Sequence, residues 1–222
     1  MKSLWRRIWG GVLTYLLAIG AYAFFRVFGG EVHGRHRLDQ FFHDGGILVA
    51  NHSSYMDWFV LASIARFEYG IWPVFLAKNR LFEHWLFGPV MEFVRCIRVA
   101  DDGSRILSEA DLRNTKCLVV FPEGKRSVDG NIGRAHTGAV RYAAMFRKPI
   151  FPVGLRGFYA VWPPHRWLPR PGQCHILCAA PREVLGHFQL PCEPAELAAE
   201  TSDIMKQIAE MVAKPAECTD SP

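Results

Sequence analysis

The sequence predicts an α/β domain built on a single mixed, largely parallel β-sheet flanked by helices. Short apolar runs typical of buried strands alternate along the chain with longer segments of helical periodicity. Half of the 222 residues are apolar, which is enough to bury a sizeable core, and the sequence contains no repeat or linker-like stretch. We therefore expect one domain at 31–222, preceded by an apolar segment at 1–30 that associates with a membrane.

The segment 1–30 carries three cations near its start and then no charge from Ile8 to Phe25. Eighteen helical residues span about 27 Å, slightly less than the roughly 30 Å hydrocarbon core of a bilayer. We favour a retained anchor that crosses the membrane or lies in one leaflet. Two alternatives stay open: a buried or interfacial helix, and a cleaved signal peptide, because residues 21–23 read Ala-Tyr-Ala, a small-x-small pattern.

The first half of the domain alternates between the two kinds of segment. Short runs with apolar residues predict strands, and spacings of three and four between apolar residues predict helices. A Gly-Pro pair at 88–89 should break the fourth helical segment. In order, we expect strands at EVHGRHRL and GGILVA, a helix at 57–68, a strand at WPVFLA, helical structure at 81–95, a strand at CIRVA, a helix at 104–114 and a buried strand at CLVVF.

The second half continues the same alternation. A helix is expected at 137–147, strands at IFPVGL and CHILCA, and a long final helix at 193–214. In sheets of this kind the functional residues collect in the loops that leave the strand ends. The loops after GGILVA and after CLVVF are therefore the expected places for functional residues.

The charge and cysteine content of the chain favour an anionic partner and argue against a disulfide framework. The chain has 26 Lys and Arg against 21 Asp and Glu, with a pI near 9.0, which favours anionic partners such as membrane surfaces or phosphorylated substrates. No lysine-rich run or aromatic RNA-binding signature is present, so nucleic acid is not an expected partner. The six cysteines include no Cys-x2-Cys pair, and we expect reduced, structural thiols, Cys174 and Cys178 among them, in a cytosolic domain.

The loop after GGILVA reads NHSSYMD and contains His52 and Asp57. Five residues along a regular helix rotate side chains by about 140°, so the two could not share a helix face. Ser54-x-x-Asp57 ahead of an apolar run resembles a capping box, which places His52 at the strand exit and Asp57 in the first helical turn. There the carboxylate can hydrogen-bond the imidazole. The alternative is that Asp57 only caps the helix and His52 is an ordinary loop residue.

The loop after CLVVF reads FPEGKRS. Its proline ends the strand ladder, and Gly124 permits a tight turn that exposes Glu123, Lys125 and Arg126. A guanidinium held by a neighbouring carboxylate is suited to bidentate phosphate binding. The alternative is a solvated, charged turn.

Together the two loops resemble the glycerolipid acyltransferases typified by 1-acylglycerol-3-phosphate acyltransferase. Asn51, His52 and Asp57 match the family's Asn-His-x4-Asp motif, and 121–127 match Phe-Pro-Glu-Gly-Thr-Arg-Ser at six of seven positions. The segments AKNRLFEHWLFGPVMEFV and KPIFPVGLRG are also similar to family segments, so the resemblance runs from about 32 to 178. It implies a glycerol-3-phosphate acyltransferase-like fold.

Two departures from the family concern the head group of the substrate. The family's second motif, Gly-x-Ile-Pro-Val-Asp-Arg, corresponds here to RCIRVAD at 95–101, which lacks the final arginine. Arg98 or Arg95 could replace it, and the pattern does not choose between them. Lys125 stands where the third motif has threonine, which adds a positive charge. The resemblance therefore supports the reaction type better than the acceptor.

The resemblance implies transfer of a fatty acyl group from acyl-CoA or acyl-acyl carrier protein to the free hydroxyl of a lysolipid. The expected acceptor is 1-acylglycerol-3-phosphate, which would give phosphatidic acid. His52 would act as general base and Asp57 would orient it, with no enzyme nucleophile, no metal and no cofactor beyond the acyl donor. The expected substrate-binding residues are Glu123, Gly124, Lys125, Arg126 and Arg98.

Because the donors are cytosolic and the acceptor is a membrane lipid, we expect the catalytic domain on the cytosolic face of the inner membrane. The stretch 157–172 mixes tryptophan, arginine and proline, as in an interfacial loop or an ordinary covering loop. Three other functions remain: acylation of another lysolipid, such as a lyso-ornithine lipid or a lysophospholipid; non-catalytic lipid binding; and soluble hydrolysis. The last lacks a Gly-x-Ser-x-Gly elbow.

Overall fold

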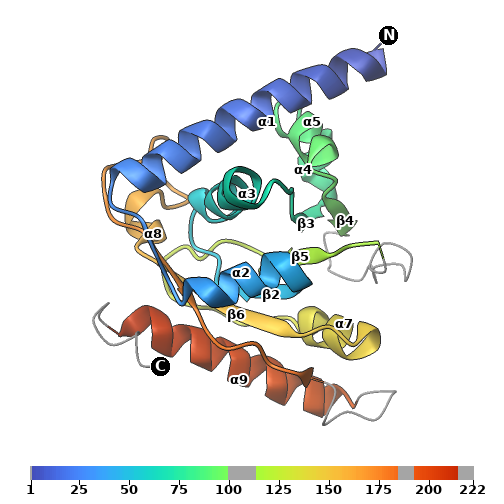
Figure 1. Cartoon of the computed structure of the whole chain (residues 1–222), viewed down its shortest axis with the longest axis vertical. Helices are drawn as coiled ribbons and strands as arrows, with labels where there is room; N and C mark the ends of the chain where they lie inside the picture. The colour runs from blue at the N-terminus through green and yellow to red at the C-terminus, as the bar shows by residue number, and fades with distance from the viewer. Residues whose placement is uncertain (1, 100–113, 185–192, 215–222) are drawn as a thin grey trace.

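One mixed sheet organises the domain, in a computed structural model that describes residues 2–99, 114–184 and 193–214. Its strand order is β1-β7-β6-β2-β5-β3-β4 (Figure 1). All neighbouring pairs are parallel except β6 and β7, so the predicted mixed, largely parallel sheet is confirmed. The strands are β1 (Glu31–His33), β2 (Gly46–Ala50), β3 (Val74–Lys78), β4 (Ile97–Val99), β5 (Cys117–Val120), β6 (Ile150–Arg156) and β7 (His175–Cys178).

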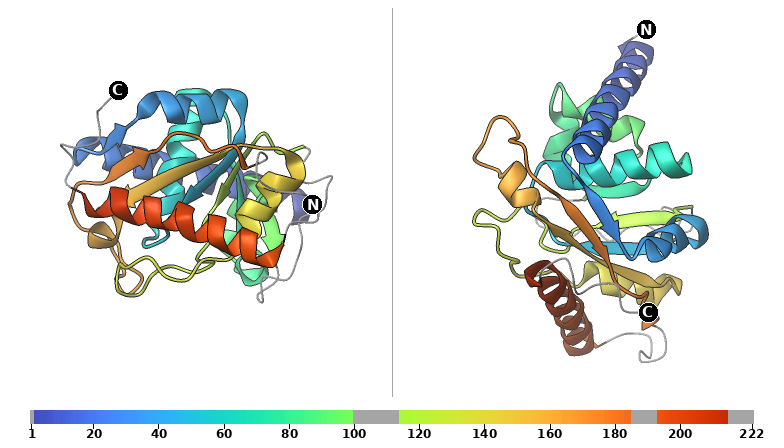
Figure 2. Two further views of the ribbon diagram at one scale, coloured as in Figure 1. Left: turned by 90° about the horizontal axis from the view of Figure 1, so that it is seen from below. Right: turned by 60° about the vertical axis from the view of Figure 1, so that its left-hand side comes forward.

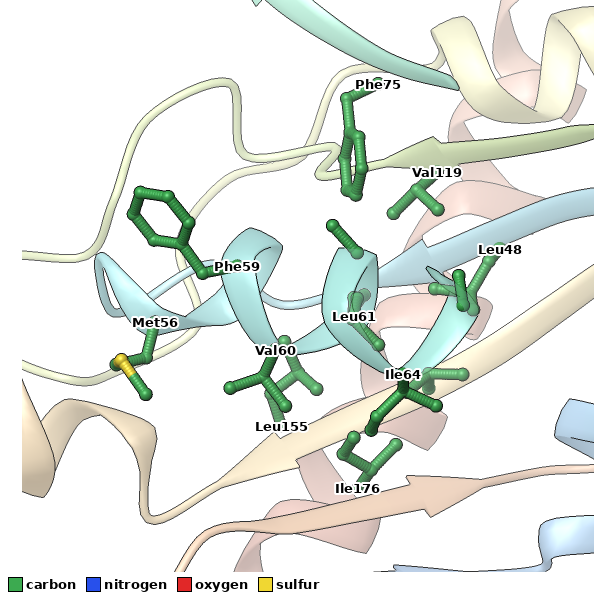
Figure 3. Close-up of a cluster of buried hydrophobic side chains, with 14 of the residues drawn as sticks. Leu48, Met56, Phe59, Val60, Leu61, Ile64, Phe75, Val119, Leu155 and Ile176 are labelled. Carbon is green, nitrogen blue, oxygen red and sulfur yellow. The ribbon is translucent and has the colours of Figure 1, made fainter. Parts of the chain in front are cut away.

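Helices cover both faces of this sheet (Figures 1 and 2). The face toward the amino-terminal helix is covered by α3, whose apolar side chains belong to one cluster with those of five strands, β2, β3, β5, β6 and β7 (Figure 3). The opposite face is covered by α7 and α9. The helices are α1 (Lys2–Val27), α2 (Arg35–Asp44), α3 (Met56–Tyr69), α4 (Asn79–Glu83), α5 (Phe87–Phe93), α7 (Gly138–Phe146), α8 (Phe158–Val161) and α9 (Pro194–Ala213).

Strand β2 shows why the central strands read as unbroken apolar runs. All five of its residues are buried, because its two faces meet two different core clusters. Leu48 belongs to the cluster under α3, whereas Ile47 and Val49 belong to the cluster under α7 and α9. Burial on both sides holds the carboxyl end of β2 rigidly, and the loop that contains His52 begins there.

Helix α1 is packed onto the domain by its small residues. A Cβ atom on Gly10 would lie 2.4 Å from the carbonyl oxygen of Pro89, and one on Gly11 would lie 2.9 Å from the Phe93 ring. Only glycine at these two positions lets α1 approach α5 so closely. By length and composition Leu4–Val27 could cross a membrane, and 33% of its most apolar 18-residue window is buried inside the domain.

Two predicted elements differ from the structure. The second half of EVHGRHRL begins α2, because Gly34 adopts a left-handed conformation that ends β1 and buried residues then follow at helical spacing. The break in 81–95 falls at 84–86, ahead of Gly88-Pro89, which lies in the first turn of α5, where a proline removes no hydrogen bond. The helix predicted at 104–114 lies almost wholly outside the described residues.

Candidate active site

His52 and Asp57 meet in a hydrogen bond, as the sequence predicted. His52 lies just after the end of β2, in the loop that leads to α3, and Asp57 lies in the first turn of α3. Nδ1 of His52 is 2.8 Å from Oδ2 of Asp57. The same oxygen accepts the backbone N–H groups of Ser53 at 2.7 Å and Ser54 at 2.8 Å. Asp57 is fully buried, so these bonds hold a carboxylate away from solvent.

The start of α3 realises half of the predicted capping box. The Asp57 carboxylate accepts the N–H of Ser54, as that motif requires. The Ser54 hydroxyl, however, accepts the N–H of Met56 at 3.0 Å, two residues on, and donates to the carbonyl of Trp162 at 2.7 Å. The site loop is therefore tied to the loop that follows α8, far along the chain.

Hydrogen bonding assigns the tautomer of His52. A carboxylate only accepts, so the proton of the contact with Asp57 sits on Nδ1 and the lone pair of the neutral ring is on Nε2. The ring stacks on Phe121 with centroids 4.3 Å apart and planes 21° apart. The His52 side chain keeps 18% of its surface exposed. Nε2 is thus the atom positioned to take a proton from a bound hydroxyl.

Glu123 joins the two motif loops through their backbones. One of its carboxylate oxygens accepts the N–H of His52 at 2.8 Å, and the other accepts the N–H of Gly133 at 2.9 Å. The N–H of Ser127 donates to the carbonyl of His52 at 2.8 Å. The buried Glu123 carboxylate faces His52, so the expectation that a neighbouring carboxylate holds the Arg126 guanidinium is wrong.

Arg126 is instead held by an aromatic ring. Its guanidinium carbon lies 3.6 Å from the centroid of Tyr55, and the side chain is half-buried. Within the described residues no carboxylate forms an ion pair with it. Lys125 and Gly124 are exposed in the same turn, and Gly124 has the left-handed φ of +65° that the turn requires. The turn therefore presents two cations beside the His52 loop.

Asn51 fixes the strand exit from which His52 departs. Its side-chain amide donates to the carbonyl of Leu155 at 3.1 Å and accepts the N–H of Leu155 at 2.7 Å. Asn51 is buried, and both bonds reach β6, so they continue the β2–β6 ladder beyond its last backbone pair. The family motif contained Asn51, but only the structure shows what its amide does.

Arg98 lies apart from the other predicted site residues. It is on the edge strand β4, which β5 and β3 separate from β2. Its guanidinium stacks on Phe82 at 4.2 Å and approaches a carboxylate oxygen of Glu92 at 3.9 Å. In the part of the chain that the structure describes, no hydrogen bond or ion pair joins it to the two motif loops. Arg95 is exposed, with a φ of +55°, and the end of that motif, 100–101, lies outside the described residues.

Three aromatic residues were not expected at the site: Phe121 under the His52 ring, Tyr55 under Arg126, and Trp162, expected only in an interfacial or covering loop, against Tyr55 at 5.3 Å. Phe121 and Tyr55 lie inside the recognised motifs, so their positions were a usable signal. Trp162 lies more than one hundred residues from Ser54 along the chain. No local pattern reveals a contact of that range.

The fold and this site define a class of protein, and the sequence comparison agrees with it. Residues 30–156, more than half of the chain, match the Acyltransferase family, and the chain belongs to that family. The resemblance seen in the two motifs is thereby confirmed. The crystal structure of the 1-acyl-sn-glycerophosphate (LPA) acyltransferase PlsC from Thermotoga maritima has the same fold, with a TM-score of 0.68 and 23% identity, covering 97% of this chain and 93% of that one.

Curated relatives share part of their length with this chain. A probable 1-acyl-sn-glycerol-3-phosphate acyltransferase of Mycoplasma pneumoniae is 30% identical over 118 residues, which are 50% of this chain and 44% of the relative. The 1-acyl-sn-glycerol-3-phosphate acyltransferase of Limnanthes alba is 27% identical over 173 residues, 73% of this chain and 54% of the relative. The chain thus spans about half the length of the curated relatives it matches.

Proposed function

We propose that this chain transfers a fatty acyl group from an acyl thioester to the free hydroxyl of a lysolipid, and that the acceptor is 1-acylglycerol-3-phosphate. The observation that carries the proposal is the buried Asp57 carboxylate bound to Nδ1 of His52, which leaves Nε2 free to accept a proton. Membership of the Acyltransferase family and the names of the relatives support the same reaction. The product is phosphatidic acid.

In the reaction, Nε2 of His52 removes the acceptor's hydroxyl proton as the oxygen attacks the thioester carbonyl carbon. A carbon–oxygen bond forms, the tetrahedral intermediate collapses, the carbon–sulfur bond breaks, and the imidazolium returns its proton to the departing thiolate. Asp57 stabilises the imidazolium that forms between these steps. General-base catalysis of this kind contributes about 10²- to 10⁴-fold in rate.

The second motif loop divides into two roles. Glu123 is a positioning residue, because both of its oxygens are bound to backbone N–H groups and one of these belongs to His52. Arg126, assisted by Lys125, binds the acceptor's phosphate, since its guanidinium lies over the Tyr55 ring beside the His52 loop and forms no ion pair within the described residues. Arg98 remains the candidate for a second phosphate contact. The donor is acyl-CoA or acyl-acyl carrier protein, and no further cofactor takes part.

Residues 1–30 form the membrane contact, and 31–222 form the catalytic domain on the cytosolic face of the inner membrane. Trp167 and Leu168, in the loop after α8, are 95% and 73% exposed. That loop lies beside the carboxyl-terminal half of α1 (Figures 1 and 2). The apolar side chains that α1 exposes on the side away from the domain are Leu4, Trp5, Ile8, Trp9, Val12, Leu16, Ile19 and Val27.

A lysolipid panel tests the proposal on the purified full chain in detergent, with labelled acyl-CoA and acyl-acyl carrier protein as donors. We expect labelled phosphatidic acid from 1-acylglycerol-3-phosphate. Arg126→Ala should raise the KM for this acceptor at least about tenfold and leave the donor KM unchanged, because it removes a charge-assisted phosphate contact. Arg147→Ala is the control, an exposed arginine at the far end of α7.

Three outcomes would contradict parts of the proposal. Acylation of a different lysolipid, with 1-acylglycerol-3-phosphate ignored, would keep the reaction and replace the acceptor. Release of free fatty acid without transfer would indicate a hydrolase. Lysolipid binding without either product would indicate a non-catalytic lipid-binding protein.

A further inference from the structure

A second cluster of polar side chains lies on β1 and β7, at the edge of the sheet opposite to the edge strand β4. It contains Glu31 and His33 of β1 and His175 of β7. Oε2 of Glu31 lies 3.1 Å from Nε2 of His33 and 3.4 Å from Nδ1 of His175, and the two ring nitrogens are 3.4 Å apart. We propose that these three residues form a binding site for one transition-metal ion of the Zn²⁺ type.

Strand pairing brings the three ligands together. Glu31 is in register with His175 in the parallel β1–β7 ladder, and the N–H of Glu31 donates to the carbonyl of Cys174 at 3.1 Å. Alternate residues of a strand share a face, so His33 points to the same side as Glu31. Both imidazoles are mostly buried, with 14% of each side chain exposed. The ligands are thus held by the sheet itself, as a preorganised metal site requires.

The distances fit a tetrahedral ion. Zn²⁺ bound at about 2.0–2.1 Å places its ligand atoms roughly 3.3–3.4 Å apart. The three observed separations, 3.1, 3.4 and 3.4 Å, form nearly the triangle that such an ion requires. Two imidazoles and one carboxylate are a zinc donor set, and three protein ligands leave one position for water. Mg²⁺ and Ca²⁺ prefer oxygen ligands and fit this site poorly.

A hydrogen-bonded triad without metal is the competing explanation. In that case one ring nitrogen would donate to the Glu31 oxygen, and the second would either donate to the same oxygen or hydrogen-bond the first ring nitrogen 3.4 Å away, according to the tautomers. Arg156, opposite His175 on β6, donates to the carbonyl of Lys214. Its charge weakens cation binding, so Arg156→Gln should tighten it.

A bound ion would have a structural role. It would join β1, which follows the proposed membrane helix α1, to β7, which follows the loop containing Trp167. In the sheet, β7 and β6 separate β1 from β2, so the ion lies about 14 Å across the strands from the His52 loop. The sequence predicts no metal. The ion proposed here would be structural, and the acyl transfer proposed above does not use it.

Metal uptake by the full chain tests the site. The untagged protein in detergent is stripped with a chelator and dialysed against Zn²⁺, and bound zinc is measured by mass spectrometry. We expect one Zn²⁺ per chain, no competition by Mg²⁺, and visible absorption of tetrahedral type when Co²⁺ is used instead. His33→Gln and Glu31→Gln should weaken zinc binding at least about 100-fold. His36→Gln, an exposed histidine of α2, is the matched control and should bind as the wild type does.

Thermal unfolding supplies a second measurement. Zn²⁺ should raise the Tm of the wild type and of His36→Gln, but not that of Glu31→Gln, whose exposed side chain can be replaced without disturbing the core. No zinc uptake by the wild type would leave only the hydrogen-bonded triad. Uptake that His33→Gln and Glu31→Gln do not reduce would place the metal on other ligands. Either result overturns the site, whatever the acyl-transfer assay shows.

Discussion

The Oδ2 atom of Asp57 accepts a hydrogen bond from Nδ1 of His52 at 2.8 Å while it also accepts two backbone N–H groups. Three donors on one oxygen hold a buried carboxylate in a single position, and the imidazole is oriented by it. His52 and Asp57 should therefore act as one unit in catalysis.

Replacing either member of this unit should remove most of the activity. We expect His52→Ala to lower kcat by about 10²- to 10⁴-fold, because the general base is lost. Asp57→Asn should cost nearly as much, since the amide can no longer fix the tautomer with Nε2 unprotonated. Initial rates of labelled acyl transfer measure both effects. His43→Ala, an exposed histidine of α2, is the control. Near-normal turnover of a folded His52→Ala protein would refute the mechanism.

Glu123 should affect turnover more than acceptor binding. Glu123→Gln keeps the size of the side chain but offers only one acceptor oxygen to the N–H groups of His52 and Gly133. One of these donors then loses its partner, and where this is the half-buried N–H of His52, the loop that holds the imidazole shifts. We expect at least a tenfold fall in kcat with little change in the acceptor KM. A large rise in that KM with unchanged kcat would instead make Glu123 a substrate ligand.

The exposed apolar face of α1 should control membrane binding. Leu16 and Ile19 are 62% and 53% exposed on α1, and burying such side chains in lipid contributes about 1.5–3 kcal/mol each at full burial. Leu16→Glu combined with Ile19→Glu should lower binding to phospholipid vesicles at least about tenfold in a sedimentation assay. The control adds the same charges at Ala198 and Ala199, exposed on α9. Equal losses in both variants would show a charge effect unrelated to α1.

The buried thiols should make stability fall at alkaline pH. Burial raises the pKa of Cys117 to about 11 and the pKa of Cys96, Cys174 and Cys178 to about 12. In the unfolded chain a thiol has a pKa near 8.5, so the unfolded state loses protons first and the stabilisation decreases as pH rises above that value. Each thiol should cost about 1 kcal/mol between pH 8.5 and 9.5.

Urea unfolding under reducing conditions at several pH values measures this effect. Cys96→Ala should reduce the slope of the unfolding free energy against pH, whatever it does to the absolute stability, because one titrating group is removed. A slope that is flat over this range in the wild type would show that the four thiols are not sequestered in the folded chain.

The sequence by itself determined the sheet class, most of the helices and strands, and the two loops that form the site. Alternating apolar patterns are local signals, and the spacing of His52 and Asp57 across a strand-to-helix turn is local too. Their hydrogen bond could therefore be predicted. The strand predicted at EVHGRHRL was wrong in its second half. Gly34 adopts a left-handed backbone conformation that ends β1, and the residues after it form α2, which buries one face.

Only the tertiary structure decided how distant segments share their polar groups. Glu123 was expected beside Arg126, its near neighbour in the chain, yet its carboxylate bonds the N–H of His52, some 71 residues away. The N–H of His52 needs an acceptor inside the site, whereas the half-buried guanidinium of Arg126 packs on Tyr55, so a tertiary contact outweighs proximity in sequence. The cluster of Glu31, His33 and His175 has the same origin: β1 and β7 come from opposite ends of the domain, and only their pairing in the sheet brings two imidazoles and a carboxylate together.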